Sequence, residues 1–221
     1  LSKWLINYYT KSGIKFIFNK SFKSFESYEN SMTNIILSDD TKINSEMVLI
    51  SAGSQANDSL FKNIKVNEFN KIKVNSFLET NIDDIYAIGD CCFFDYYSKE
   101  IRLESIQNAT DQAKTVAKNI LGVKEQYNFV PWFWSDQLNV KLQIVGLLDS
   151  NSDIDIKILG SQESSKFSNF IFANDQLKAV ESINSPGHHL IMKSNWEKRH
   201  LLKKNLLTSD FNLKNFFYSL T

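Results

Sequence analysis

The first quarter of the chain carries a short helical pattern followed by β-type runs. Trp4, Leu5 and Tyr8 recur at helical spacing ahead of Gly13, which predicts a helix over residues 1–11. Short runs rich in β-branched and aromatic residues then predict strands over residues 14–18, 32–37 and 46–52. The last run is apolar at four successive positions, 47–50, as in a strand buried on both faces of an α/β sheet. We therefore expect an α/β domain segment over residues 1–53.

The middle of the chain fits strands, a turn and then a long helix. A short alternating segment predicts a strand over residues 71–74, and an apolar run predicts a second, buried strand over residues 85–88 that stops at Gly89. From Glu104 the pattern becomes helical and Gly122 is placed to end it. The helix face expected to be buried consists of Ile106, Ala109, Ala113, Val116, Ala117 and Ile120. Residues 54–128 are expected to form this second segment.

After Pro131 the pattern changes to a run of alternating strands. The predicted strands cover residues 140–145, 154–158, 167–172 and 177–183, with Asn174-Asp175 as a hairpin turn between the last two. Ser185-Pro186 is typical of a helix start, and this helix is predicted to run to about Arg199. Residues 129–221 are thus expected to form an antiparallel sheet with helices, so that the whole chain is α/β followed by α+β.

Charge and hydropathy exclude several classes of partner. The 25 basic and 25 acidic side chains cancel and form no long run of one sign, so neither nucleic acid nor an anionic membrane is expected as a partner. The sequence has no apolar stretch near the ~20 residues that a membrane-spanning helix needs, and no signal-peptide pattern at its start. It begins with Leu1 instead of Met. We expect a cytoplasmic protein of which this chain is a piece.

The cysteines and histidines point to no metal site. Cys91 and Cys92 are neighbours, too close for an unstrained disulfide and too few for an iron–sulfur or zinc site, so they are expected to be small side chains in a partly buried position. His188, His189 and His200 are expected to have surface or helix-capping roles.

The strongest chemical signal is an acidic residue directly after a predicted buried strand. Gly89 would let a ligand approach the backbone, and the carboxylate of Asp90 would lie at the carboxyl end of the strand, where open α/β sheets bind ligands. Such a carboxylate can accept hydrogen bonds from a polyhydroxyl chain. Taken alone, Gly-Asp after a strand fits an ordinary turn equally well.

Longer motifs around this turn carry a family resemblance. Residues 80–90, with Thr80 and Ala-Ile-Gly-Asp, resemble the second flavin-binding motif of the FAD-dependent pyridine-nucleotide oxidoreductases. Residues 102–113, which begin Arg-Leu-Glu-Ser, and the run Pro-Trp-Phe-Trp at 131–134 resemble the reductases of ferredoxin or rubredoxin, the putidaredoxin-reductase type. The resemblance implies an enzyme that uses FAD and NAD(P)H and reduces a ferredoxin or rubredoxin-like acceptor.

The resemblance also implies roles for individual residues. Asp90 would hold the ribityl chain of the flavin with Gly89 giving backbone clearance, and Ile106 would contact the flavin through its main chain. Glu104 would lie near the docked nicotinamide, and Trp134 beside the isoalloxazine ring. A flavin that must pass single electrons needs a ring that is shielded yet near the surface, which an aromatic side chain at its edge provides.

The docking surface for the electron carrier would include Trp134 and Lys114, the latter at a position where the family has a basic residue. Lysine supplies a point charge there without the two-pronged hydrogen bonding of arginine. The simpler alternatives stay open: Glu104 and Lys114 on a solvated helix face, and Trp132 and Trp134 in a plain aromatic core.

The phosphate-binding part of such an enzyme is not in this sequence. A dinucleotide fold needs Gly-x-Gly-x-x-Gly, and no two of the seven glycines stand two apart. We therefore expect the chain to carry only the end of an NAD(P) domain, the second FAD segment and a C-terminal domain, without the N-terminal FAD and NAD half. Two other functions remain open: a non-catalytic interaction or dimerisation module, and part of a related disulfide reductase.

Overall fold

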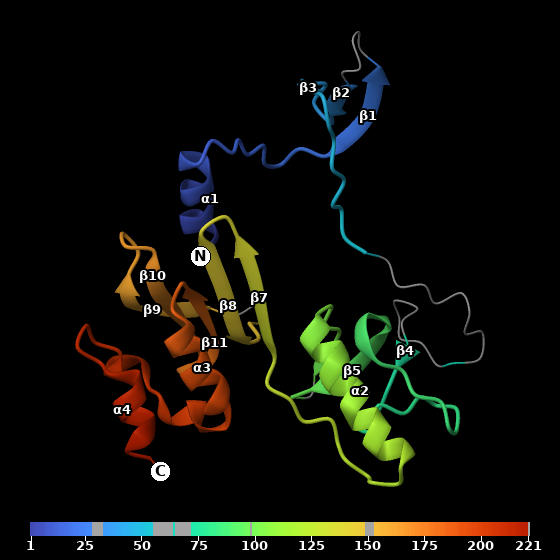
Figure 1. Cartoon of the computed structure of the whole chain (residues 1–221), viewed down its shortest axis with the longest axis vertical. Coiled ribbons are helices and arrows are strands. Elements are labelled where there is room, and N and C mark those ends of the chain that lie inside the picture. The colour runs from blue at the N-terminus through green and yellow to red at the C-terminus, as the bar shows by residue number, and fades with distance from the viewer. Residues whose placement is uncertain (28–32, 55–63, 65–71, 98, 149–152, 221) are drawn as a thin grey trace. The chain divides into compact units, whose positions relative to one another are not determined.

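Figure 1 shows a computed structural model of the chain, which describes residues 1–27, 33–54, 64, 72–97, 99–148 and 153–220. Its contacts divide it into two compact units, Leu1–Gln55 and Ala56–Thr221. Each unit is described by itself.

The first unit contains one helix and a small antiparallel sheet. Helix α1 (Ser2–Lys11) confirms the predicted helix, and the rings of Trp4 and Tyr8 stack along it with centroids 5.3 Å apart. The sheet has the order β1-β2-β3, with β1 at Phe22–Ser27, β2 at Thr33–Leu37 and β3 at Lys42–Ser45. Strand β2 confirms the predicted strand over its described residues. Strand β1 was not predicted, because a bulge between Phe22 and Ser24 interrupts its alternation.

Two predicted strands of the first unit are wrong. Residues 14–18 and 46–52 have no strand structure, and Met47 and Leu49 are 85% and 89% exposed. Alternation and apolar character report a preference for burial, but a strand also needs a neighbour that pairs with its backbone. Within the described residues of this unit, neither segment pairs with the three-stranded sheet.

The second unit begins with a small sheet and a long helix. Strands β4 (Ile72–Lys73), β5 (Cys92–Tyr96) and β6 (Lys99–Ile101) pair in that order, β4 parallel and β6 antiparallel to β5. The predicted strand over residues 85–88 is wrong, since only an isolated bridge between Glu79 and Tyr86 forms there. The Gly89-Asp90 turn, a 3₁₀ helix η1 (Gly89–Cys91), therefore precedes strand β5 instead of ending a strand.

Helix α2 (Ile106–Ile120) confirms the predicted helix, but of its predicted buried face only Val116 is buried. The side chain of Ser105 caps its start by accepting a hydrogen bond from the N–H of Asn108, 3.2 Å away. The residues that α2 buries are Asn108, Gln112, Thr115 and Val116, whereas Ile106 and Ile120 are 69% and 66% exposed. The helix turns polar side chains inward because its neighbours there present backbone and side-chain polar groups, which burial would otherwise leave unpaired.

The C-terminal part of the second unit is an antiparallel sheet of order β7-β8-β11-β10-β9. Its strands are β7 (Trp132–Gln137), β8 (Val140–Gly146), β9 (Ile154–Ser161), β10 (Lys166–Ala173) and β11 (Gln176–Ile183). Strands β8 to β11 confirm the predicted ones, whereas the sequence pattern does not predict β7. Asn174 and Asp175 both have positive φ, 51° and 58°, as the predicted two-residue hairpin turn requires.

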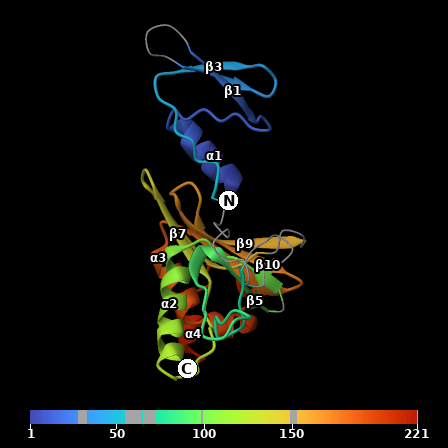
Figure 2. The same cartoon turned by 90° about the vertical axis from the view of Figure 1, so that its right-hand side faces the viewer.

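Helices follow the sheet and complete its core. Helix α3 (Pro186–Ser194) starts at the predicted proline and ends earlier than predicted, and η2 (Trp196–Leu201), η3 (Lys204–Leu206) and α4 (Leu213–Tyr218) follow. Helix α3 lies against β8 and β11 (Figure 1), and the side view shows β9 and β10 above α4 (Figure 2). Their shared core includes Val145, Phe170, Val180, Met192, Trp196 and Phe217.

Gly146 sets how closely Trp196 packs on the sheet, and replacing this glycine tests the packing. Its φ is +89°, and a Cβ there would lie 2.3 Å from both the Trp196 ring and the Lys178 carbonyl oxygen. We expect Gly146→Ala to lower the free energy of unfolding by about 2–4 kcal/mol through overlap and backbone strain. Urea unfolding followed by tryptophan fluorescence measures this. Gly187→Ala, where a Cβ meets nothing within 4 Å, is the control and should change stability by under about 1 kcal/mol.

Candidate functional site

The Gly89-Asp90 turn is held against the first half of helix α2. Gly89 is buried with a φ of +74°, which favours glycine, and its N–H donates a 2.6 Å hydrogen bond to Oε1 of Gln112. A Cβ on Gly89 would lie 3.4 Å from the Cβ of Ala109, in ordinary contact. The turn and the helix thus pack directly on one another, and the carboxylate of Asp90 is left on the exposed side.

Gln112 is the buried anchor of this turn. Its side chain is fully buried, and Oε1 also accepts a hydrogen bond from the thiol of Cys92, 3.6 Å away. Burial, with a smaller contribution from Cys91, raises the pKa of the Cys92 thiol to about 12, so that it remains protonated at neutral pH and available as a donor. Nε2 of Gln112 has no hydrogen-bond partner among the described residues.

Arg102 links two residues that the sequence predicted for the site. Its guanidinium pairs with the carboxylate of Glu104 and also donates a hydrogen bond to the backbone carbonyl of Asp90, 3.3 Å away. Asp90 and Glu104 are both exposed. The structure therefore brings Gly89, Asp90 and Glu104 together beside the start of α2, through Arg102, for which the sequence motifs imply no role.

The first turn of α2 contains an exposed apolar side chain and a buried polar one. Ile106 is 69% exposed at the first position of the helix. Oε1 of the next residue, Gln107, is buried without a hydrogen-bond partner among the described residues. Further along the helix, the exposed Lys114 pairs with Asp111 at 3.4 Å. The described contacts do not join Lys114 to Asp90.

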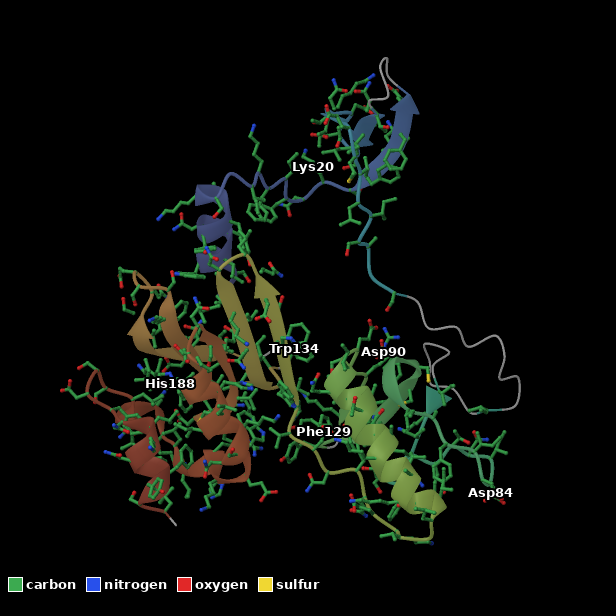
Figure 3. The ribbon with its side chains drawn as sticks, viewed as in Figure 1. Lys20, Asp84, Asp90, Phe129, Trp134 and His188 are labelled. Atoms are coloured by element: carbon green, nitrogen blue, oxygen red, sulfur yellow. The ribbon has the colours of Figure 1, made fainter. Side chains whose placement is uncertain are left out.

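Trp134 lies on β7 and packs in a row of rings. Its ring stacks on that of Trp132, with centroids 5.7 Å apart. Trp132 in turn lies 5.6 Å from the ring of His189, and Nζ of Lys193 lies 3.5 Å from the Trp132 centroid. Figure 3 shows Trp134 and Asp90 on separate elements of the second unit, one on β7 and the other at the end where α2 begins.

The expected surface or capping role is wrong for His189, which is 1% exposed. Burial, with the nearby charge of Lys193, lowers the pKa of His189 to about 4, and its Nδ1 has no partner among the described residues. His200 is exposed and its Nδ1 lies 3.0 Å from the Glu197 carbonyl oxygen.

The sequence did contain a signal for the anchor that was missed. Asn108, Gln112 and Thr115 follow one another at spacings of four and three, so they form a polar stripe along one helix face. All three are buried, and Asn108 is hydrogen-bonded to the Tyr127 hydroxyl at 3.0 Å. A polar stripe of this kind on a long helix indicates buried polar partners.

Among the described residues, no group of three or more His, Cys, Asp and Glu side chains is arranged to hold a metal ion. The helices of that same part of the chain include none with the length and apolar character needed to cross a bilayer.

Removing the Gln112 amide tests whether it anchors the turn. We expect Gln112→Leu to lower the free energy of unfolding by about 1–3 kcal/mol, because the buried N–H of Gly89 loses its acceptor. Hydrogen exchange of the Gly89 amide should accelerate. NMR exchange and urea unfolding measure the two effects. Gln126→Leu, at an exposed position, is the control and should change stability by at most about 0.5 kcal/mol. Unchanged Gly89 exchange would contradict the anchor.

Acidification should destabilise the fold through His189. The pKa of His189 is 6.5 in the unfolded chain and about 4 in the folded one. Between pH 4 and pH 6.5 the unfolded chain therefore binds more protons than the folded one. Stability is then fully present above pH 6.5 and falls by about 3 kcal/mol on acidification to pH 4. We expect His189→Phe to remove this component from urea unfolding measured across that range. His200→Gln, at an exposed site, should retain it.

Comparisons with known proteins cover nearly the whole chain. Residues 1–113 match the family model described as pyridine nucleotide-disulphide oxidoreductase, and residues 132–217 match the model described as reductase C-terminal. The chain is 30% identical over 217 residues to rhodocoxin reductase from Rhodococcus erythropolis, covering 97% of this chain and 50% of that protein. It is 31% identical over 160 residues to putidaredoxin reductase from Pseudomonas putida, covering 72% and 37%.

Solved structures agree with these relatives. The ferredoxin reductase for the CYP199A2 system from Rhodopseudomonas palustris has a TM-score of 0.89 at 29% identity, over 97% of this chain and 54% of that one. The covalent putidaredoxin reductase–putidaredoxin complex gives 0.89 at 27% identity, over 99% and 53%. The chain thus spans about half the length of the curated relatives it matches. By sequence and by fold, it belongs to the pyridine nucleotide-disulphide oxidoreductase family.

Proposed function

We propose that the chain is part of an FAD-dependent enzyme that oxidises NAD(P)H and passes single electrons to a ferredoxin or rubredoxin. The observation that carries this proposal is the anchored turn, because it presents the exposed carboxylate of Asp90 from a backbone that Gln112 and Arg102 hold in place. The relatives named as rhodocoxin, putidaredoxin and rubredoxin reductases support it.

The residues at the start of α2 fit a flavin. A bound ligand along this helix start would cover Ile106, which is 69% exposed. The carboxylate of Asp90 suits the hydroxyl groups of a ribityl chain, since an ionised carboxylate is an acceptor only.

Each of the site residues then has a defined role. Asp90 accepts hydrogen bonds from the ribityl hydroxyls, Gly89 keeps the turn close to α2, and the main chain of Ile106 contacts the flavin. Glu104, oriented by Arg102, borders the place where the nicotinamide docks. The bound flavin supplies the conversion of a two-electron hydride into single electrons. Trp134, supported by its stack on Trp132, shields one edge of the ring from water.

The carrier is proposed to dock over Trp134 and Lys114. Lys114 is exposed, and its pairing with Asp111 at 3.4 Å is a surface contact that costs little to rearrange. Carrier proteins of this kind bind through small, polar interfaces in which charge steers the encounter. The solved complex of putidaredoxin reductase is covalently joined to putidaredoxin, which supports a carrier-docking surface on this chain.

The whole protein is proposed to contain a further N-terminal FAD and NAD half that supplies both phosphate sites. In this proposal residues 1–53 end the NAD(P)-binding domain, residues 54–128 form the second segment of the FAD-binding domain, and residues 129–221 form the C-terminal reductase domain. The cytoplasmic location expected from the sequence, without a membrane or nucleic-acid partner, belongs to the same proposal.

The proposal is tested on the longer polypeptide that contains this sequence. We expect its absorption spectrum to show flavin bands that NADH or NADPH bleaches. Asp90→Ala should weaken FAD binding about tenfold or more, because a charged acceptor is lost. Asp210→Ala, at an exposed position in the C-terminal segment, is the matched control and should leave the affinity unchanged.

Electron transfer to the carrier is tested separately. We expect Trp134→Ala to slow reduction of a ferredoxin more than reduction of ferricyanide, a small acceptor that needs no docking surface. Lys114→Glu should raise the KM for the ferredoxin and leave that for NAD(P)H unchanged. A longer polypeptide without flavin would overturn the reductase proposal and favour an interaction or dimerisation module.

A further inference from the structure

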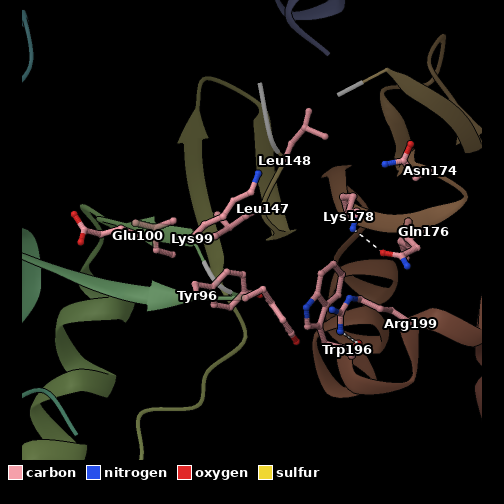
Figure 4. Close-up of a pocket in the computed structure, with 13 residues that line it drawn as sticks. Tyr96, Lys99, Glu100, Leu147, Leu148, Asn174, Gln176, Lys178, Trp196 and Arg199 are labelled. Atoms are coloured by element: carbon pink, nitrogen blue, oxygen red, sulfur yellow. Dashed lines mark hydrogen bonds between the residues drawn. The ribbon is translucent and has the colours of Figure 1, made fainter. Parts of the chain in front are cut away.

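A cavity of about 790 Å³ lies in the second unit between the β5–β6 hairpin and the C-terminal sheet (Figure 4). Aromatic rings form a large part of its wall, with Tyr96 and Tyr97 from the hairpin and Trp196 from η2. Leu147 and Leu177 add aliphatic surface. None of these residues belongs to the turn at Gly89 or to the row of rings at Trp134. A volume of this size is typical of pockets for small organic ligands.

The charged residues of the wall are mostly cationic. Lys99, Lys178 and Arg199 line the cavity, and Glu100 is the acidic residue of the wall. The Glu100 carboxylate lies 2.8 Å from Nζ of Lys73, which is not a lining residue, so its charge is compensated outside the cavity. The wall therefore has an excess of positive charge.

Lys178 and Arg199 are held by neutral groups. Nζ of Lys178 donates to the amide oxygen of Gln176 at 2.8 Å, as the dashed line in Figure 4 shows. Nη1 of Arg199 donates to the backbone carbonyl of Trp196 at 3.0 Å. These bonds fix the direction of the two side chains and leave further N–H donors on each, since an ammonium has three and a guanidinium five.

Arg199 also joins the two sides of the cavity. Its guanidinium carbon lies 5.4 Å from the ring centroid of Tyr97 on the hairpin and 5.0 Å from that of Trp196. Contact with the faces of two rings reduces the water around this cation and keeps it at the aromatic wall. Burial raises the pKa of Tyr96, which therefore remains a neutral phenol and adds no negative charge. Ring surface and positive charge thus occur side by side.

We propose that this cavity binds a planar aromatic carboxylate, with its ring against Tyr96 and Tyr97 and its carboxylate toward Lys178 and Arg199. An uncharged aliphatic ligand would form no ion pair with the cations of the wall. An inorganic anion would make no contact with its aromatic rings. This site lies outside the flavin and carrier surfaces proposed above, and its occupancy does not depend on them.

The test uses 1-naphthoate as the probe and the neutral 1-naphthalenemethanol as its matched analogue. Isothermal titration of the 221-residue chain, with its fold checked by near-ultraviolet circular dichroism, should give saturable 1:1 binding of the naphthoate. The naphthalenemethanol should bind at least about fivefold more weakly. Raising the salt concentration should weaken only the naphthoate. Equal affinity of the two compounds, or no saturable binding of naphthoate, would overturn the proposal.

A charge-removing variant locates the site. We expect Lys178→Met to weaken the naphthoate about fivefold to tenfold and to leave the naphthalenemethanol unchanged, so that the preference for the anion shrinks. Lys141→Met removes an exposed lysine of β8 that is not a lining residue and should alter neither affinity. Equal effects of the two variants would overturn this placement. The comparison of the two compounds on the unaltered chain decides the charge preference even where a variant fails to fold.

Discussion

The candidate site depends on one buried amide. Gln112 sits at the junction of helix α2 and the turn before β5, where it accepts hydrogen bonds from a backbone N–H and a thiol that have no access to water. A leucine at position 112 could be buried but could not accept these hydrogen bonds. A carboxylate there would be a buried charge, which is costly away from water. Helix α2 thus holds the backbone of the turn on one side. The carboxylate of Asp90 remains exposed, where a ligand can contact it. Arg102 adds a second support by holding the carbonyl of the same residue.

Local rules succeeded where the structure is determined by nearby residues. The four strands β8 to β11 and the turn at Asn174-Asp175 followed from alternation and from residues that tolerate positive φ. The start of α3 at Pro186 followed from the fixed φ of proline, and α2 from its helical spacing. In each of these cases the signal and its cause lie within a few residues of one another.

Prediction failed where burial depends on distant partners. The apolar run at residues 47–50 looks like a core strand, yet it is exposed because no described strand of its unit pairs with it. Helix α2 buries mainly polar side chains where an apolar face was predicted, since Gln112 and Asn108 meet polar groups from the turn and from Tyr127. The motifs pointed to Asp90, Glu104 and Trp134, but the contacts that hold them come from Arg102, Gln112 and Trp132. Residue spacing alone carries no information on those long-range contacts.

The lysine above Trp132 has an effect on the chemistry of the paired indoles. A positive charge 3.5 Å from the Trp132 ring centroid attracts the electrons of that ring and raises the energy needed to remove one of them. Trp134, the next ring in the stack, has no such charge among its described contacts. The two indoles are therefore unequal towards oxidation, and Trp132 is the one from which the nearby charge makes an electron harder to remove.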